Sequence, residues 1–305
     1  MLAPMQSVTN RALRSLFAKW ARPDVLFTEF MRVKPSRIGG PLNPKDLREA
    51  RGEEHGIPLV FQLIGGDPAA VVEAARAAQR AGAAHLNLNV GCPFGRMGAG
   101  SGGNLLRRTP VLEAMLAALR AEVTGSLSVK VRAGYDDPEQ LFSLLPLFEA
   151  AGVDFLVLHP RTVAQAYDGE ADHRITARVV GRTSLPVIAN GDVRTAADGR
   201  RVLEETGAAG LMLGRGAIAD PDLFARLRGE APFTAEGDAR ASSLRRYFSE
   251  VLEQYERVFC GEAHVLANAK SIVGFVGGAE YPKTFKRLMR AKSLGLFREA
   301  LEEWA

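Results

Sequence analysis

Cysteine is rare in this sequence, whose 305 residues include only Cys92 and Cys260. Two cysteines cannot build the disulfide framework of a small secreted protein, so we expect a reducing, cytoplasmic setting. The first residues lack the basic flank and long apolar stretch of a secretory signal, and no apolar run is long enough to span a membrane. The histidines show no ligand spacing typical of a metal site. We therefore expect neither a membrane partner nor a bound metal.

Lysine is scarce as well, with 8 residues against 31 arginines. A lysine inside an apolar run is therefore informative. Lys130 lies between Val129 and Val131 in the run "LSVKVRAG", and its side chain points to the face opposite the valines. A lysine that points into a protein is costly unless an anion or a partner receives it. Taken alone, Lys130 is as consistent with a structural role as with a ligand site.

Positive charge gathers near the carboxyl end of the chain. Residues 264 to 298 contain seven basic residues and one acidic residue, a net charge of +6. A patch of this density can neutralise several nucleic-acid phosphates. A solvated helical face would explain the same charges, and charge alone leaves both interpretations open.

Short apolar runs alternate with helix-like segments through most of the chain, which is the pattern of repeated strand–helix units. We expect eight strands, at Leu2–Met5, Val25–Glu29, Leu59–Leu63, His85–Val90, Ser128–Arg132, Phe155–His159, Val187–Asn190 and Gly210–Leu213. This rhythm predicts an α/β fold of the (β/α)8 TIM-barrel type. A doubly wound sheet is the competing prediction, weakened because no G-x-G-x-x-G opens a helix after the first strand.

The strand pattern stops before residue 238, and helix-like stretches such as "SSLRRYFSEVLEQYERVF" follow. We therefore predict a barrel domain over residues 1–230 and a small helical domain over residues 238–305. Residues 228–239, "RGEAPFTAEGDA", are the expected linker.

Polar side chains stand at the end of every predicted strand, where a barrel of this kind carries its chemistry. Examples are Gln62, Asn89, His159 and Asn190. Glycines in "VIANGDV" and "LMLGRGAI" end the last two strands, and glycine there allows the backbone to approach a phosphate closely. Together these residues predict a large polar ligand with a phosphate over the mouth of the barrel.

A family resemblance rests on nine short motifs that follow one another along essentially the whole chain: "LAPM", "TEFMRV", "QLIG", "LNVGCP", "SGGNLL", "VKVRAGYD", "LHPRT", "VIANGD" and "GRGAI". In this combination the chain resembles the tRNA-dihydrouridine synthases, flavin enzymes that reduce uridine in tRNA. "TEFMRV" and "SVKVRAGYD" are most similar to the bacterial C-type branch, which favours position 16 of the D-loop.

The resemblance implies a bound FMN, NADPH as reductant, tRNA as partner and a monomeric protein. It implies that Cys92 donates a proton to the uracil; an unperturbed thiol is mostly protonated at neutral pH. The implied FMN contacts are Pro4, Met5, Gln6, Gln62, Lys130, His159, Asn190, Gly191, Asp192, Gly214 and Arg215. The implied contacts with the uracil or with tRNA phosphates are Arg32, Asn89, Arg132, Lys270, Lys283, Lys286 and Arg287.

The chain departs from the family pattern next to the expected proton donor, where Phe94 and Gly95 follow Cys92-Pro93. In "LHPRT", Pro160 removes a backbone N–H beside the expected flavin site. Two alternatives stay open. One is an FMN barrel enzyme that reduces a free pyrimidine, similar to dihydroorotate dehydrogenase, which does not predict the basic tail. The other is a non-catalytic RNA-binding homologue.

Overall fold

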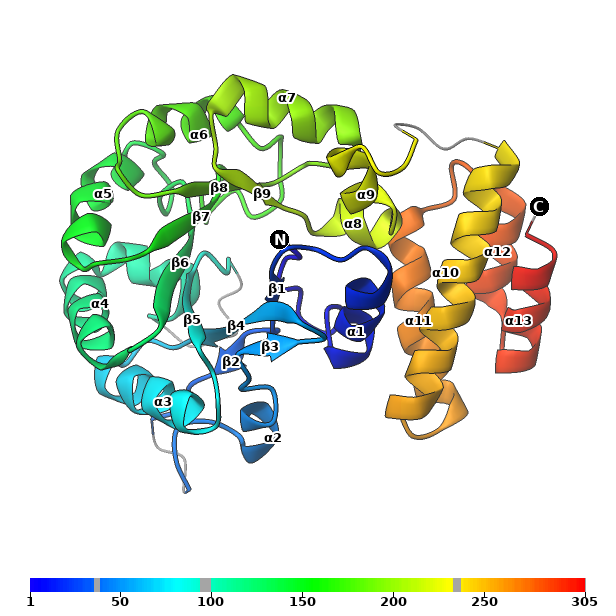
Figure 1. The fold of residues 1–305 in the computed structure, drawn as a ribbon, viewed down its shortest axis with the longest axis horizontal. Helices are drawn as coiled ribbons and strands as arrows, with labels where there is room; N and C mark the ends of the chain where they lie inside the picture. The colour runs from blue at the N-terminus through cyan, green and yellow to red at the C-terminus, as the bar shows by residue number, and fades with distance from the viewer. Residues whose placement is uncertain (36–38, 94–99, 233–236, 305) are drawn as a thin grey trace.

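Seven parallel strands form most of a barrel wall, in the order β1-β4-β5-β6-β7-β8-β9 (Figure 1). The computed structural model describes residues 1–35, 39–93, 100–232 and 237–304. The strands are β1 (Leu26–Phe27), β4 (Ile57–Ile64), β5 (His85–Val90), β6 (Ser126–Arg132), β7 (Phe155–His159), β8 (Val187–Asn190) and β9 (Gly210–Met212). Two short strands, β2 (Met31–Arg32) and β3 (Glu53–Glu54), pair with β4 at its two ends.

The first residues of the chain close the barrel between β1 and β9. Leu2 forms a parallel bridge with Leu213, and its N–H donates to the carbonyl of Val25 at 3.0 Å. The N–H of Ala3 donates to the carbonyl of Leu213 at 2.8 Å. The amino-terminal segment therefore takes the place of the remaining strand, and the predicted (β/α)8 barrel is confirmed.

The predicted strand positions agree with the structure most closely in the middle of the chain. β5, β7 and β8 have the predicted bounds. The prediction is too long at the start, because Leu2–Met5 is reduced to one bridge and Val25–Glu29 to Leu26–Phe27. Both segments turn early to build loops at the mouth of the barrel.

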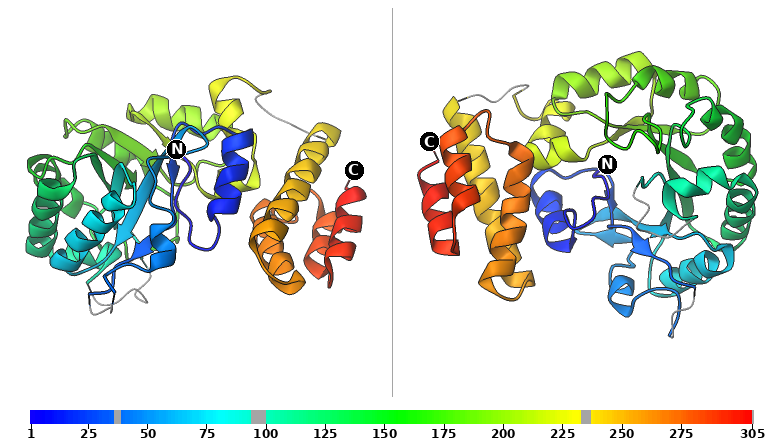
Figure 2. Two further views of the ribbon diagram at one scale, coloured as in Figure 1. Left: turned by 60° about the horizontal axis from the view of Figure 1, so that its bottom comes forward. Right: turned by 180° about the vertical axis from the view of Figure 1, so that it is seen from behind.

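Helices follow the strands and surround the barrel (Figures 1 and 2). In chain order the helices of the barrel part are α1 (Arg11–Trp20), α2 (Pro44–Leu47), α3 (Pro68–Arg80), the 3-10 helix η2 (Gly102–Arg107), α4 (Thr109–Glu122), α5 (Gln140–Ala150), α6 (His173–Val180), α7 (Ala196–Thr206), α8 (Arg215–Ala219) and α9 (Leu223–Arg228). Local sequence sets their ends. The side chain of Asp67 accepts from the N–H of Ala70 at 2.8 Å at the start of α3, and Gly82 takes a φ of +113° just after its end.

Four helices form the carboxyl-terminal part: α10 (Gly237–Val258), α11 (Glu262–Val276), α12 (Pro282–Arg290) and α13 (Leu294–Glu302). They lie at one side of the barrel, where α10 packs beside α1 and α11 beside α8, while α12 and α13 lie farther out (Figures 1 and 2). The helical C-terminal region was expected. The proposed domain boundaries stay a prediction, and part of the proposed linker lies outside the described residues. None of the described helices is long and apolar enough to cross a membrane.

The interface between barrel and tail is a continuous apolar core. Phe17 of α1 meets Tyr247 of α10 edge-to-face, with ring centroids 6.3 Å apart, and Trp20 lies 6.2 Å from the same ring. Phe17 and Tyr247 are both buried, and they belong to one cluster that includes residues of the barrel and of all four carboxyl-terminal helices. The two parts are therefore held by burial of apolar side chains, which a flexible tether would not provide.

We expect Phe17→Ala to lower the free energy of unfolding by about 3–5 kcal/mol and to destabilise both parts together. Urea unfolding followed by tryptophan fluorescence and far-UV circular dichroism measures this, since Trp20 and Trp304 both lie against the shared core. The matched control is Phe142→Ala on α5, because this half-buried ring contacts the guanidinium groups of Arg178 and Arg182 and packs against a different apolar cluster from the one shared with the tail. Independent unfolding of the tail, with an unchanged barrel transition, would contradict the shared core.

Candidate active site

A cavity of about 720 Å3 opens at the carboxyl ends of the barrel strands. Its described lining comes from the loops after the strands and from one carboxyl-terminal helix: Ala3, Pro4, Met5, Gln6, Val8, Phe30, Asn89, Gly91, Cys92, Pro93, Lys130, Arg132, His159, Tyr167, Asn190, Gly191, Asp192, Val193, Arg194, Met212, Gly214, Arg215, Gly216 and Phe275. Four of these side chains are lysine or arginine and one is a carboxylate. The lining therefore favours an anionic ligand.

A ladder of buried amides supports the floor of this cavity. Gln62 and Asn87 face each other in the register of β4 and β5, and Gln62 Nε2 donates to Asn87 Oδ1 at 2.7 Å. Asn87 Nδ2 in turn donates to Ser128 Oγ on β6 at 2.8 Å. Asn89 Nδ2 donates to Gln62 Oε1 at 2.9 Å. Each buried amide thus has a partner inside the barrel, which removes the cost of burying it.

Asn89 positions the backbone of Cys92. Its Oδ1 atom accepts from the N–H of Gly91 at 3.1 Å and from the N–H of Cys92 at 2.9 Å. The carbonyl of Cys92 accepts from the N–H of Gly103 at 3.0 Å. Gly102 must lack a side chain, since a Cβ there would lie 3.1 Å from the Cβ of Cys92 and its φ is +57°. Cys92 therefore has a defined place on the cavity wall.

Lys130 lies on the neighbouring strand β6, in register with Asn89, and donates from Nζ to Asn190 Oδ1 at 2.9 Å. Asn190 Nδ2 donates to the carbonyl of Met212, which fixes the orientation of this amide. Burial, together with the positive charge of Arg132, lowers the pKa of Lys130 to about 7. An anion in the cavity would favour the charged form of this lysine.

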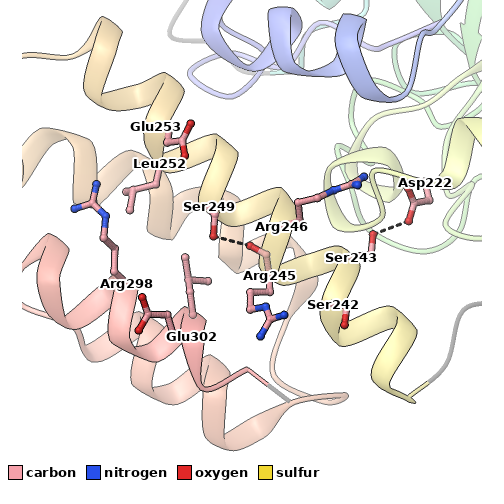
Figure 3. Close-up of a pocket in the computed structure, with 11 residues that line it drawn as sticks. Asp222, Ser242, Ser243, Arg245, Arg246, Ser249, Leu252, Glu253, Arg298 and Glu302 are labelled. Atoms are coloured by element: carbon pink, nitrogen blue, oxygen red, sulfur yellow. Dashed lines mark hydrogen bonds between the residues drawn. The ribbon is translucent and has the colours of Figure 1, made fainter.

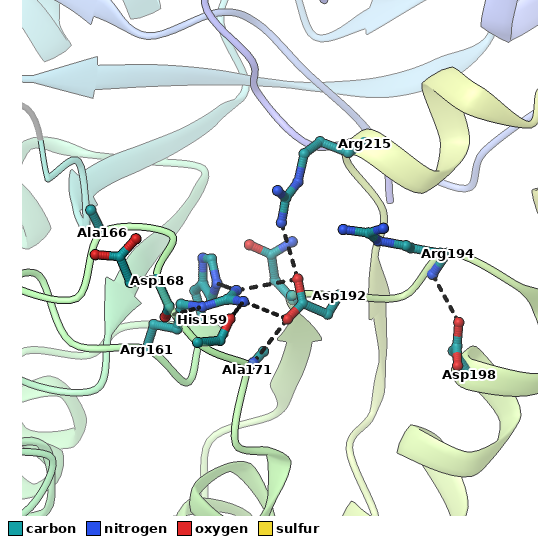
Figure 4. A network of polar contacts seen from close by, with 12 residues as sticks. His159, Arg161, Ala166, Asp168, Ala171, Asp192, Arg194, Asp198 and Arg215 are labelled. Atoms are coloured by element: carbon teal, nitrogen blue, oxygen red, sulfur yellow. Dashed lines mark hydrogen bonds and ion pairs between the residues drawn. The ribbon is translucent and has the colours of Figure 1, made fainter. Parts of the chain in front are cut away.

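Asp192 is the centre of an ion-pair network at the end of β8 (Figure 4). Its carboxylate accepts from Arg161 Nη2 at 2.6 Å, from Arg215 Nη2 at 3.0 Å and from the N–H of Ala171 at 2.9 Å. Partial burial opposes ionisation, but the hydrogen bonds from Arg161 and Ala171 and the charges of both arginines outweigh it, so the pKa of Asp192 lies below its ordinary value. Its φ of +48° follows the +126° of Gly191. The network holds this unusual turn beside the cavity.

Most of the predicted ligand residues line this one cavity. The lining includes Cys92, Asn89, Arg132 and the predicted flavin contacts Pro4, Met5, Gln6, Lys130, His159, Asn190, Gly191, Asp192, Gly214 and Arg215. Gln62 is the exception among the predicted flavin contacts. It is fully buried, with both ends of its amide bound to Asn87 and Asn89, so it lies below the lining.

The predicted tRNA contacts are more dispersed. Arg32 is exposed on β2 and does not belong to the described lining. Lys270 donates to the carbonyl of Ala291 within the helical part. Lys283, Lys286 and Arg287 are exposed on α12, where Arg287 is paired with Glu303. The predicted charge cluster ends just before Glu299, Glu302 and Glu303, so part of its charge is compensated by α13 and the residues after it. Phe94 and Gly95 lie outside the described residues.

The sequence did not identify the three aromatic side chains of the described lining, which are Phe30, Tyr167 and Phe275. Tyr167 lies on the loop after β7, 50% exposed, with the guanidinium carbons of Arg132 and Arg215 at 5.3 and 5.2 Å from its ring centre. The rule that strand-end loops line a barrel site could have found it. Phe275 of α11 could not be found this way, because it reaches the cavity only through the packing of the tail.

A second cavity, of about 890 Å3, lies on the tail, where α10 and α13 meet (Figure 3). Arg245, Arg246 and Arg298 are balanced there by Asp222, Glu253 and Glu302. Arg246 also stacks over Trp20 and Arg298 is paired with Glu256. With balanced and largely engaged charges, this groove is a weaker candidate than the barrel cavity.

The model of the dihydrouridine synthase family matches residues 1–293. The chain belongs to this family. It is 32% identical over 320 residues to a probable tRNA-dihydrouridine synthase of Rhodobacter capsulatus, covering 99% of this chain and 94% of that protein. It is 34% identical to a tRNA-dihydrouridine(16) synthase of Pseudomonas putida, over 73% of this chain and 71% of that one. It is 35% identical to tRNA-dihydrouridine synthase B of Vibrio cholerae, over 75% and 70%.

Solved structures of similar fold include morphinone reductase in complex with tetrahydroNAD, with a TM-score of 0.57, 15% identity and coverage of 78% of this chain and 88% of that one. A variant of NCR from Zymomonas mobilis has a TM-score of 0.56 and 16% identity over 77% and 88%. At these identities the likeness concerns the barrel fold alone. As a dihydrouridine synthase, the chain is a flavin-dependent oxidoreductase.

The residues of the cavity fit a flavin that carries a phosphate. Gly191 and Gly214 line the cavity with bare backbone, and neither position has room for a side chain: a Cβ at Gly214 would lie 3.3 Å from Met5 Sδ, and one at Gly191 would lie 2.9 Å from the Cβ of Ala171. Lys130 and Arg215 supply positive charge, and Asn190 and His159 supply polar atoms. This donor set can bind an anionic group and polar ring edges at once.

FMN affinity of this dihydrouridine synthase, measured on flavin-free protein, is expected to fall as the pH rises above about 7, by up to about tenfold per pH unit. Lys130 has a pKa of about 7 in the free protein, so above this pH it must take up a proton when an anion binds. Fluorescence titration with FMN between pH 7 and 9 measures the effect. Lys130→Met should bind FMN more weakly, and its affinity should depend less on pH. If the affinity of the variant fell with pH as steeply as that of the wild type, the pH dependence could not be assigned to Lys130.

Proposed function

We propose that this dihydrouridine synthase reduces the C5=C6 bond of a D-loop uridine in tRNA, with FMN as cofactor, NADPH as reductant and Cys92 as proton donor. The observation that carries the proposal is the place of Cys92, on the wall of a positively charged barrel cavity that also contains Lys130. A non-catalytic homologue would have no need to keep a thiol and a lysine facing one cavity. Family membership likewise argues against a free pyrimidine as the substrate.

Cys92 is the residue that moves a proton in this proposal. When bound, reduced flavin supplies a hydride to C6 of the uracil. The Cys92 S–H bond breaks as the new C5–H bond forms on the opposite face, and the thiolate regains its proton from solvent. The hydrogen bond from the Cys92 N–H to Asn89 Oδ1 sets where the thiol lies. Asn89 would thus act mainly by positioning Cys92, since both acceptor positions of its oxygen are used.

The remaining cavity residues bind the cofactor in this proposal. Lys130, His159 and Asn190 provide polar atoms, and the turn at Gly191 and Asp192 provides backbone N–H groups for the phosphate. The carboxylate of Asp192 would not contact a phosphate itself, because it is paired with Arg161 and Arg215. Pro4, Met5, Gln6, Gly214 and Arg215 complete the proposed contacts.

The tRNA substrate explains the exposed lysines of α12. The target uridine must leave its stack to enter the cavity, as bases do in other enzymes that modify them. Arg132 lines the cavity, while Lys283 and Lys286 are available for backbone phosphates. Position 16 of the tRNA is the favoured site, because the chain shares motifs with the C-type branch and is similar to the tRNA-dihydrouridine(16) synthase of Pseudomonas putida. We propose that the protein acts as a monomer in the cytoplasm.

Cys92→Ala should retain its flavin and still be reduced by NADPH, but should form dihydrouridine at least ~100-fold more slowly, since the general acid is lost. Single-turnover assays with tRNA from a strain lacking the gene measure the rate, and mapping of dihydrouridine identifies the position. Cys260→Ala is the matched control, because this cysteine is exposed on the tail. If Cys92→Ala formed dihydrouridine as fast as the wild type, the proton added to C5 would have to come from another group.

Charge reversal of Lys283 and Lys286 to Glu should weaken tRNA binding and reduce its salt dependence, because fewer counterions are released. Each lost phosphate contact lowers the slope of log K against log salt by about 0.7–0.9. Filter binding at several salt concentrations measures both quantities. Lys45→Glu with Arg80→Glu is the control, as these exposed residues lie on α2 and α3 of the barrel. Equal losses in both double variants would indicate a general charge effect.

A further inference from the structure

Arg161 is buried behind the cavity wall, and its guanidinium group contacts His159, Asp192 and two backbone carbonyls. Its side chain is 3% exposed and lies on the loop after β7 (Figure 4). Nη2 donates to Asp192 Oδ2 at 2.6 Å and to the carbonyl of Gly169, and Nε donates to the carbonyl of Asp168 at 3.2 Å. Arg161 does not belong to the described lining, so its effect on a ligand must pass through its neighbours.

One of those neighbours is His159, whose Nε2 atom lies 3.1 Å from Arg161 Nη1. A guanidinium group has five N–H donors, no acceptor, and is not deprotonated in proteins. The imidazole nitrogen that faces it must therefore be the acceptor. This contact leaves the single ring proton of a neutral His159 on Nδ1.

The charges around His159 are consistent with a neutral ring. Burial, reinforced by the positive charges of Lys130, Arg132, Arg161 and Arg215, holds the pKa of His159 far below its ordinary value. Gly191 leaves room for this ring, because a Cβ at that position would lie only 3.1 and 3.2 Å from the Cδ2 and Nε2 atoms of His159. The Nε2 edge therefore lies against Arg161 on one side and the bare backbone of Gly191 on the other.

We propose that Arg161 is a positioning residue that fixes His159 as the neutral Nδ1–H tautomer, so that His159 offers the cavity a hydrogen-bond donor and no positive charge. Nδ1 has no protein partner among the described residues, and His159 lines the cavity. The group that accepts this proton is a ligand oxygen or nitrogen with a lone pair. That last step rests on the proposed flavin; the tautomer itself does not.

The pairing of Arg161 with Asp192 makes the arrangement specific. One guanidinium group binds two partners. Its Nη1 atom donates to His159 Nε2 and to Asp192 Oδ1 at 3.2 Å, and its Nη2 atom donates to Asp192 Oδ2 at 2.6 Å. A lysine offers a point charge without this fork, so it cannot serve both partners in the same plane. The same side chain therefore sets the tautomer of His159 and supports the turn at Asp192.

The test is 15N nuclear magnetic resonance of the histidine rings in the full-length, flavin-bound protein between pH 6 and 8, without tRNA or NADPH. The signal of His159 is assigned by its loss in His159→Gln. We expect a protonated Nδ1 and an unprotonated Nε2 throughout this pH range. A protonated Nε2, or a doubly protonated ring at pH 7, would overturn the proposal from the wild-type spectrum alone.

Arg161→Met removes the donors while keeping the length of the side chain, and it should move the ring proton to Nε2 or mix the two tautomers. Arg161→Lys should restore the wild-type pattern only in part. Arg194→Met is the control, since Arg194 lines the same cavity but forms no hydrogen bond with His159 among the described residues, and it should leave the spectrum unchanged. An unaltered His159 tautomer in Arg161→Met would overturn the positioning role. If the wild-type protein formed no dihydrouridine in tRNA, the proposed function would be wrong, but the tautomer of His159 would be unaffected.

Discussion

Closure of the barrel by Leu2 and Ala3 is the constraint on which the site depends. Their backbone hydrogen bonds to Val25 and Leu213 join the first and last parts of the sheet. Closure puts the loop after Ala3 directly at the cavity, where Met5 lies against Gly214. It also fixes where α1 leaves the barrel, and α1 carries the apolar face on which α10 packs. The same few residues thus place both the cavity-lining loop after Ala3 and the helical tail.

The cavity wall brings several positively charged side chains close together, and their mutual repulsion has to be offset by the protein. Asp192 is the one carboxylate in the described lining, and it is shared between Arg161 and Arg215. Asn190 receives the ammonium of Lys130 as a neutral acceptor, which leaves the positive potential of the cavity in place. A second carboxylate at that position would stabilise Lys130 better but would weaken binding of an anion. The arrangement therefore favours binding of an anion over the stability of the cavity without a ligand.

The sequence predicted the strands and the strand-end residues well, because alternation and polar ends are local properties. β5, β7 and β8 have the expected bounds, and Lys130 and Cys92 meet at one cavity as the barrel rule required. It could not predict which way an amide turns. Gln62 and Asn89 both stand near the ends of predicted strands, yet β4 continues to Ile64 and the amide of Gln62 is used entirely in the buried ladder. That distinction depends on cross-strand register, which no single strand contains.

The tail shows the same limit at a larger scale, since net charge in a window says nothing about pairing between helices. Arg287 is one of the predicted tRNA contacts, but it faces Glu303 across the packing of α12 and α13. Phe275 belongs to the same tail and is the one residue after Gly216 in the described cavity lining. α11 therefore packs into the shared core with one part of its surface and reaches the cavity with another. In the proposed function, a tRNA bound at α12 would be held in a set position relative to the cavity by this apolar core, so the packing of the tail would determine which uridine reaches the cavity.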